Sequence, residues 1–144
     1  GELTKLKYLG TVNTSITDFT PVRNFSELEL INVPPKFDDD QLRHLEGLSK
    51  LTNIGLDGTR VTDEGMAFIG SMKQVRWLAI RDTAVGDAGL AYLKELPLLS
   101  YLHLEGTQVA DNQISDLKKS LPNCEVTGPS HKKTLDRFTL STLD

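Results

Sequence analysis

The chain has 144 residues, of which 38% are hydrophobic and 25% are charged, and its formal net charge is −4. This length and composition predict one globular domain with a sizeable buried core. Lysine and arginine never follow one another in runs longer than pairs, which argues against a nucleic-acid-binding surface. A single cysteine excludes an internal disulfide framework. No apolar stretch reaches about 18 residues, so we expect no membrane span.

A motif of about 24 residues repeats along the chain and defines the predicted elements. Each unit carries apolar residues at its first, fourth and sixth places, and the alternation predicts a short strand with one buried face. A fixed period of this size is typical of a solenoid, in which each unit buries its apolar face only against its neighbours. The six units open at Leu3, Phe25, Leu51, Val75, Leu99 and Leu121.

Each predicted strand leads through a turn to a short amphipathic helix. The turn has threonine at the ninth place, and an aspartate four places later is interpreted as the helix N-cap. Gly65 and Gly89 stand near two helix starts, where we expect a close approach of helix and neighbouring backbone. The threonines are Thr11, Thr59, Thr83 and Thr107; the aspartates are Asp18, Asp39, Asp63, Asp87 and Asp111; the apolar helix stripes are Leu42/Leu45/Leu48, Met66/Ile69/Met72, Leu90/Leu93/Leu96 and Ile114/Leu117.

The fifth unit, Leu99-x-x-Leu102-x-Leu104-x-x-Thr107-x-Val109, resembles the core pattern of leucine-rich repeat proteins, with threonine where asparagine is more usual. The form Thr83-x-Val85-x-Asp87-x-Gly89-Leu90 resembles bacterial, planctomycete-type repeats, and the first unit resembles the shorter internalin-type repeat. The resemblance implies an α/β solenoid, a right-handed β-α superhelix with a concave parallel sheet and convex short helices. We expect a repeat domain of about five repeats plus a terminal strand over residues 1–127, and a C-terminal cap or tail over residues 128–144.

Side chains at the third, fifth and seventh places of each unit are predicted to point outward from the concave sheet. Trp77 and Tyr101 then become neighbours on a mostly polar face, an arrangement typical of protein-binding hot spots. The alternative is that the two rings only stack on each other and cover the sheet. The same frame places Leu9 and Ile31 in a second, apolar patch on this face. The predicted partner-binding residues are Asn53, Trp77, Ala79, Arg81, Tyr101, His103 and Glu105.

Catalytic and metal-binding patterns are missing from the sequence. His44, His103 and His131 show no metal-ligand spacing, and the glycines form no phosphate-binding loop. Cys124 falls at a predicted core position and is interpreted as a buried structural thiol. The run of aspartates over residues 38–40 coincides with a helix start, where acids favour the positive end of the helix. We therefore expect a non-enzymatic protein without cofactor or metal.

The predicted function is a module that binds a protein partner on the concave sheet. Two alternatives stay open: a structural spacer or C-terminal cap of a longer repeat protein, and glycan recognition through the aromatic pair. The start on Gly1, with the repeat entered by Leu3, suggests a piece of a longer protein. Leu135, Phe138 and Leu140 offer apolar side chains for a cap over the last repeat, against a disordered tail or a docking segment.

Overall fold

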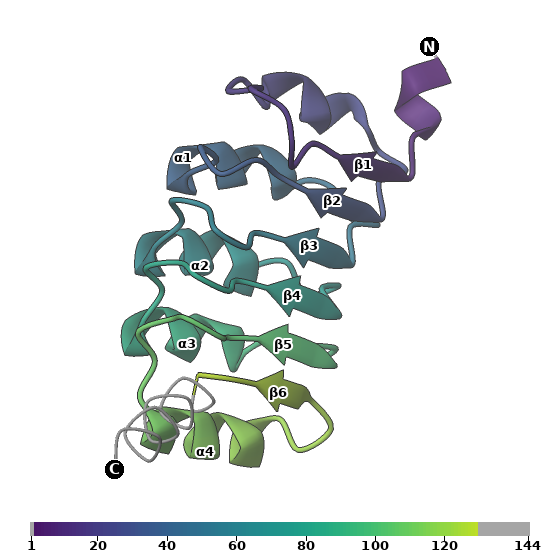
Figure 1. Cartoon of the computed structure of the whole chain (residues 1–144). Helices are drawn as coiled ribbons and strands as arrows, with labels where there is room; N and C mark the ends of the chain where they lie inside the picture. The colour runs from purple at the N-terminus through teal and green to yellow at the C-terminus, as the bar shows by residue number, and fades with distance from the viewer. Residues whose placement is uncertain (1, 130–144) are drawn as a thin grey trace.

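A computed structural model describes residues 2–129 of the chain. Six three-residue strands pair in sequence order into one parallel sheet, with one strand from each repeat (Figure 1). Across the sheet, Tyr8, Leu30, Asn53, Trp77, Tyr101 and Glu125 are aligned at equivalent positions. The strands are β1 (Tyr8–Gly10), β2 (Leu30–Asn32), β3 (Asn53–Gly55), β4 (Trp77–Ala79), β5 (Tyr101–His103) and β6 (Glu125–Thr127).

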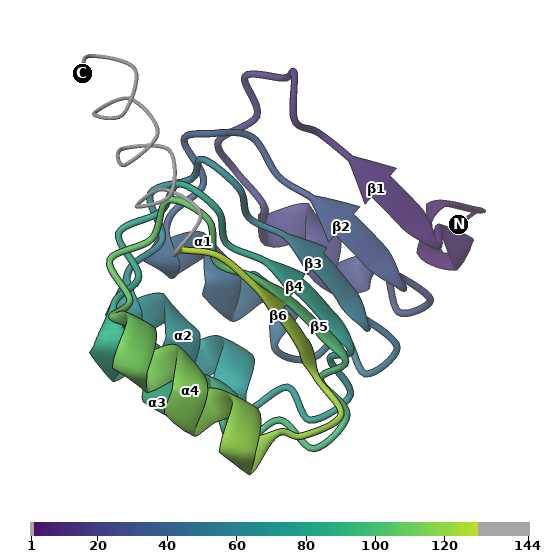
Figure 2. The ribbon, with the colours of Figure 1, turned by 60° about the horizontal axis from the view of Figure 1, so that its bottom comes forward.

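Every α-helix lies on the same side of the sheet, which leaves the opposite face open (Figures 1 and 2). The first repeat has a 3-10 helix in place of an α-helix, which agrees with its shorter sequence. The helices are α1 (Asp39–Leu42), α2 (Asp63–Gly70), α3 (Asp87–Leu93) and α4 (Asp111–Ser120), with 3-10 helices η1 (Glu2–Lys5), η2 (Thr20–Asn24) and η3 (Arg43–Leu45). The leucine-rich repeat architecture expected from the sequence is confirmed.

The core lies between the sheet and the helices, and the predicted apolar frame of the three central repeats is confirmed. Ile54, Leu78 and Leu102, the middle residues of β3, β4 and β5, have no exposed surface. All four predicted helix stripes are buried as well. A helix of one to three turns is marginal alone, so this packing holds the helices against the sheet.

The predicted frame of the outer repeats is wrong. The strand register requires the first two units to open at Leu6 and Leu28, three residues later than predicted. An odd shift exchanges the two faces of a strand, so Ile31 is fully buried and Leu9 packs partly against the core. The predicted apolar patch of Leu9 and Ile31 therefore does not exist. The sixth unit is displaced by two residues, which keeps its faces but moves Glu125 into alignment with Tyr101.

The turn threonines bind local backbone as expected, except at the N-terminus. Thr59, Thr83 and Thr107 each donate the hydroxyl to the carbonyl three residues earlier, at 2.7 Å. In the first repeat Thr14 makes this bond, whereas the predicted Thr11 donates to Asn32 O in the next strand at 2.9 Å. This exchange is the same three-residue error of the predicted frame.

Three of the predicted capping aspartates, Asp39, Asp63 and Asp87, join neighbouring repeats and are not N-caps of their own helices, whereas Asp18 accepts from Thr20 N at the start of its own η2. Asp63 is the first residue of α2, and its Oδ1 accepts from the backbone N–H of Gly86 at 2.7 Å and of Gly89 at 3.0 Å in the next repeat. Asp39 and Asp87 accept likewise from Thr62 N and Ala110 N. The N-cap positions are Asp38, Thr62, Gly86 and Ala110. Each of the three joining carboxylates thus ties one repeat to the start of the following helix.

Gly65 and Gly89 are closely approached as expected, but the approaching atoms belong to side chains and not to neighbouring backbone. A Cβ atom at Gly89 would lie 2.6 Å from Asp63 Oδ1 and 3.0 Å from Met66 Cγ. At Gly65 the crowding atoms belong to Asp39 and Leu42 of the preceding repeat. The glycines leave room for the carboxylate that bonds the helix start.

Replacing Gly89 with alanine is expected to lower the free energy of unfolding by about 1–3 kcal/mol, because the added methyl displaces the Asp63 carboxylate and overpacks Met66. Helix propensity alone favours alanine, so a loss of stability measures the steric effect. Urea denaturation followed by circular dichroism gives the value. Gly47→Ala is the matched control, since nothing lies within 4 Å of its Cβ position. Equal stability of the two variants would contradict the close approach.

Candidate functional site

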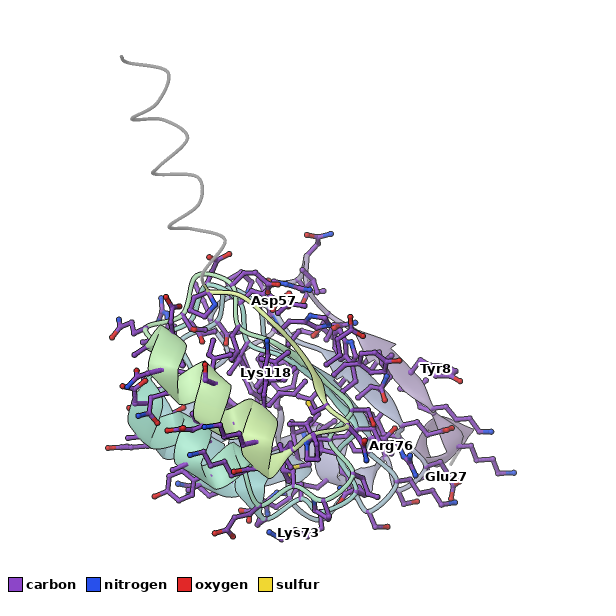
Figure 3. The ribbon with its side chains drawn as sticks, turned by 90° about the horizontal axis from the view of Figure 1, so that it is seen from below. Tyr8, Glu27, Asp57, Lys73, Arg76 and Lys118 are labelled. Carbon is purple, nitrogen blue, oxygen red and sulfur yellow. The ribbon has the colours of Figure 1, made fainter. Side chains whose placement is uncertain are left out.

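The open face of the sheet consists of three rows of outward positions that run across the strands. Figure 3 looks along the stack and shows Tyr8 beyond the sheet, on the side away from the helices. The row at the first residue of each strand, called here the aromatic row, contains Tyr8, Leu30, Asn53, Trp77, Tyr101 and Glu125. The middle row contains Gly10, Asn32, Gly55, Ala79, His103 and Thr127, and the charged row two residues further contains Asp57, Arg81 and Glu105.

Trp77, Tyr101 and His103 form an aromatic cluster on this face. Trp77 and Tyr101 are aligned on neighbouring strands, and the Tyr101 side chain is 47% exposed. The ring that Trp77 contacts is His103, with the ring centroids 5.6 Å apart and the planes at 62°. His103 Nδ1 lies 2.9 Å from Thr127 Oγ1, which fixes the imidazole. No stacked pair of Trp77 and Tyr101 is found among residues 2–129, and Tyr101 is the most exposed of the three rings.

Arg81 is held between two carboxylates from the neighbouring repeats. Its Nη1 donates to Asp57 Oδ2 at 2.9 Å, and its Nε donates to Glu105 Oε2 at 2.9 Å. The Arg81 backbone N–H also donates to Asp57 Oδ1 at 2.8 Å. These bonds orient all three side chains of the charged row. The two carboxylates also balance the positive charge of Arg81 within the protein.

The pKa values of this row follow from the same contacts. Burial disfavours the charged guanidinium, but the hydrogen bonds and charges of Asp57 and Glu105 outweigh it, so the pKa of Arg81 lies above its ordinary value. Burial also raises the pKa of Glu105, but hydrogen bonds from Thr127 and the backbone, with the charge of Arg81, bring it below the ordinary value. Arg81 and Glu105 are therefore both ionised near neutral pH.

One of the predicted site residues, Ala79, is fully buried. Ala79 has no exposed surface, so it cannot contact a partner, and the prediction for this residue is corrected. Asn53 is half-buried, and its Oδ1 accepts from the Thr52 hydroxyl at 3.0 Å. The accessible members are Asn53, Trp77, Arg81, Tyr101, His103 and Glu105.

The aromatic row also contains residues that the predicted frame missed. Tyr8, 66% exposed, and Leu30 occupy the positions that the sequence assigns to Lys5 and Glu27, and Glu125 lies beside Tyr101. The repeat lengths in the sequence could have revealed the correct frame. Units that open at Leu6, Leu28 and Asn123 give lengths of 22, 23, 24, 24 and 24 residues, whereas the predicted frame gives 22, 26, 24, 24 and 22. Regularity of length was the better guide to the strand register.

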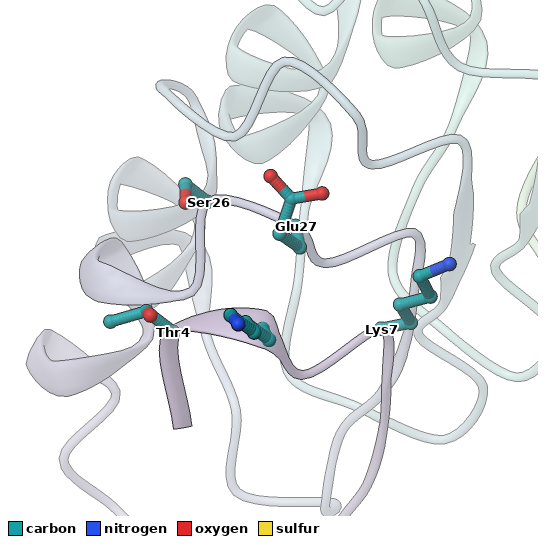
Figure 4. Close-up of a pocket in the computed structure, with 5 residues that line it drawn as sticks. Thr4, Lys7, Ser26 and Glu27 are labelled. Atoms are coloured by element: carbon teal, nitrogen blue, oxygen red, sulfur yellow. The ribbon is translucent and has the colours of Figure 1, made fainter. Parts of the chain in front are cut away.

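A surface hollow of about 410 Å³ lies between the segment from η1 to the start of β1 and the loop before β2 (Figure 4). Its lining residues are Thr4, Lys5, Lys7, Ser26 and Glu27. Glu27 is already paired with Lys50 Nζ at 2.7 Å, and this hydrogen bond and charge keep the pKa of Glu27 below its ordinary value. Two of the charged groups that line the hollow, Glu27 and Lys7, are therefore already in ion pairs.

Three other features were sought among residues 2–129: a metal site, a cysteine nucleophile and a membrane-spanning helix. Residues 2–129 contain no group of three His, Cys, Asp or Glu side chains placed to hold a metal ion. Cys124 is buried, and burial raises the pKa of its thiol to about 11, so it is not a thiolate nucleophile at neutral pH. Within the same range no helix has the length and apolar character needed to cross a membrane.

The sequence matches no protein-family model and no curated protein, but its fold is similar to solved structures. An internalin C2 of Listeria monocytogenes aligns with 87% of this chain at 20% identity and a TM-score of 0.69, and an internalin InlF of the same organism aligns with 86% at 20% identity and a TM-score of 0.60. The chain spans 52% and 41% of their respective lengths. Together with the observed sheet and helices, these likenesses show that the chain has the leucine-rich repeat fold of the internalins.

Proposed function

We propose that this protein is a non-catalytic module that binds a protein partner on the open face of its sheet. The observation that carries the proposal is the aromatic cluster of exposed Tyr101 with partly buried Trp77 and His103, beside the ion-paired Arg81. Interface hot spots are enriched in tryptophan, tyrosine and arginine, which desolvate a large area and keep a polar group. The planctomycete-type character of the repeats stays a prediction.

The scaffold supports this proposal because it holds the cluster rigidly. Trp77 and Tyr101 lie on strands that are hydrogen-bonded on both sides, and the residues that follow them, Leu78 and Leu102, are fully buried. Arg81 is clamped by two ion pairs before any partner arrives. A pre-organised surface loses little side-chain freedom on binding, which favours affinity.

Alanine at Trp77 or Tyr101 is expected to weaken partner binding by at least tenfold, since a buried aromatic anchor contributes about 2 kcal/mol or more. The measurement selects peptides from a displayed random library on the immobilised protein and then determines their affinity by calorimetry. Tyr92→Ala is the matched control, because Tyr92 lies on α3 with 46% of its side chain exposed. We expect this variant to bind as the unchanged protein does.

Binders that tolerate Trp77→Ala and Tyr101→Ala but lose affinity with Tyr92→Ala would place the site on the helical side and contradict the proposal. Circular dichroism of each variant checks that the repeat fold is retained. Glycan recognition is tested in parallel on a glycan array with the same three variants. Array binding that requires Trp77 and Tyr101, without any peptide binder, would favour the glycan alternative.

A structural spacer is the second candidate, favoured by an apolar hollow of about 240 Å³ at the first repeat. Ile16, 42% exposed, and Phe25 are among the side chains around it. A neighbouring unit packed there would remove this apolar surface from water. An open face that selects no binder at all would favour the spacer. The complete lining is Leu9, Thr11, Ile16, Asp18, Phe19, Pro21, Val22 and Phe25.

A further inference from the structure

The C-terminal half of the open face carries an excess of negative charge next to its aromatic rings. Across β3 to β6, the three outward rows hold the carboxylates of Asp57, Glu105 and Glu125 and the guanidinium of Arg81. The formal charges of these four side chains sum to −2. Arg76 lies at the edge where the strands start (Figure 3), and including it still leaves an excess of one negative charge.

The guanidinium of Arg81 is already paired with carboxylates of the protein itself. Arg81 bonds both Asp57 and Glu105 at 2.9 Å, so it offers little attraction to an incoming anion. Glu125 is different: it is exposed, and among residues 2–129 it has no ion-pair partner. Its position directly beside Tyr101 in the aromatic row places a carboxylate next to a half-exposed ring.

We propose that the partner segment bound here is cationic and presents an arginine side chain to Tyr101 and Glu125. A guanidinium stacks on an aromatic face through the cation–π interaction and, at the same time, donates hydrogen bonds to a carboxylate in a forked geometry. Trp77 extends the aromatic surface on the other side of Tyr101. This inference rests on the proposed function and adds the chemistry of the partner, because like charges disfavour an acidic segment at the same place.

Trp77 makes the test site-specific, because it is the only tryptophan of the chain. Three peptides with the same glycine and serine frame are titrated against the whole protein, carrying three arginines, three glutamines or three glutamates. We expect a saturable change of Trp77 fluorescence with the arginine peptide alone. Its apparent Kd should rise at least threefold between 50 mM and 500 mM salt, since exposed charges are screened. No response to the arginine peptide, or an equal response to the glutamine or glutamate peptide, overturns the inference.

Variants then locate the contact. Glu125→Gln and Tyr101→Ala are each expected to weaken binding of the arginine peptide by about 3- to 30-fold, the usual strength of such contacts. Glu64→Gln and Tyr92→Ala are matched controls on α2 and α3, and both should bind as the unchanged protein does. Unchanged affinity with Glu125→Gln and Tyr101→Ala overturns the inference, as does equal weakening by the controls.

The two proposals fail in different ways. Library peptides that need Trp77 and Tyr101 but contain no arginine or lysine would overturn the cationic partner and leave the open-face function standing. Both proposals would be overturned if library peptides bind elsewhere and the Trp77 fluorescence does not change in the titration with the arginine peptide.

Discussion

Truncation of Leu78 to alanine is expected to lower the free energy of unfolding by about 2–5 kcal/mol. Leu78 is the middle residue of β4, has no exposed surface, and is flanked on both sides by paired strands whose equivalent residues are Ile54 and Leu102. The substitution removes apolar contacts and leaves a cavity that cannot collapse, because the neighbouring repeats fix the strand spacing. Urea denaturation followed by circular dichroism measures the effect.

Leu98→Ala is the matched control for this prediction, because Leu98 lies outside the strands and is 43% exposed. The same chemical truncation there should change the free energy of unfolding by about 0.5 kcal/mol or less. Comparable losses at Leu98 and Leu78 would contradict the assignment of the fourth place of the repeat unit to the core.

Replacing Asp63 with alanine is expected to cost about 2–4 kcal/mol, although Asp63 lies outside the apolar core. The change removes the carboxylate that accepts from Gly86 N and Gly89 N, and two backbone donors at the start of α3 lose their partner. Bonds to an ionised acceptor are stronger than neutral ones, which enlarges the loss. The expected readout is a lower urea midpoint with an unchanged slope.

Two further variants separate this bond from general effects of charge. Asp63→Asn keeps one carbonyl acceptor without the charge, so it should lose less stability than Asp63→Ala. Asp116→Ala removes an exposed carboxylate from α4 and should stay within about 0.5 kcal/mol of the unchanged protein. If Asp116→Ala lowers the free energy of unfolding as much as Asp63→Ala, the hydrogen bonds between repeats do not explain the loss at Asp63.

The central repeats could be predicted in detail because their sequence repeats without insertion. Thr59, Thr83 and Thr107 recur at intervals of 24 residues, and this spacing fixes both faces of β3, β4 and β5. Trp77 and Tyr101 were therefore placed correctly on the open face. Around the first two strands, apolar residues occur so often that two frames fit the apolar pattern. The predicted frame was the wrong one, and it placed the buried Ile31 on the surface.

The partners of polar side chains could not be predicted from their position in the repeat. An aspartate at a helix start satisfies the usual N-cap pattern, and only the stacking of repeats shows that Asp63 binds the helix of the following unit. Ala79 has an outward position, yet its exposure depends on the side chains around it. The proximity of Trp77 to His103 likewise depends on rotamers that the sequence leaves open.

The repeated spacing by itself determined the solenoid, its parallel sheet, the core of the central repeats and the strands that carry the aromatic residues, because each of these follows from local periodicity. Tertiary structure alone decided the register of the outer strands, the bonds between repeats and the pairing of Arg81 with Asp57 and Glu105. These depend on which segments lie side by side, and that contact is a property of the packed stack and is absent from any single repeat.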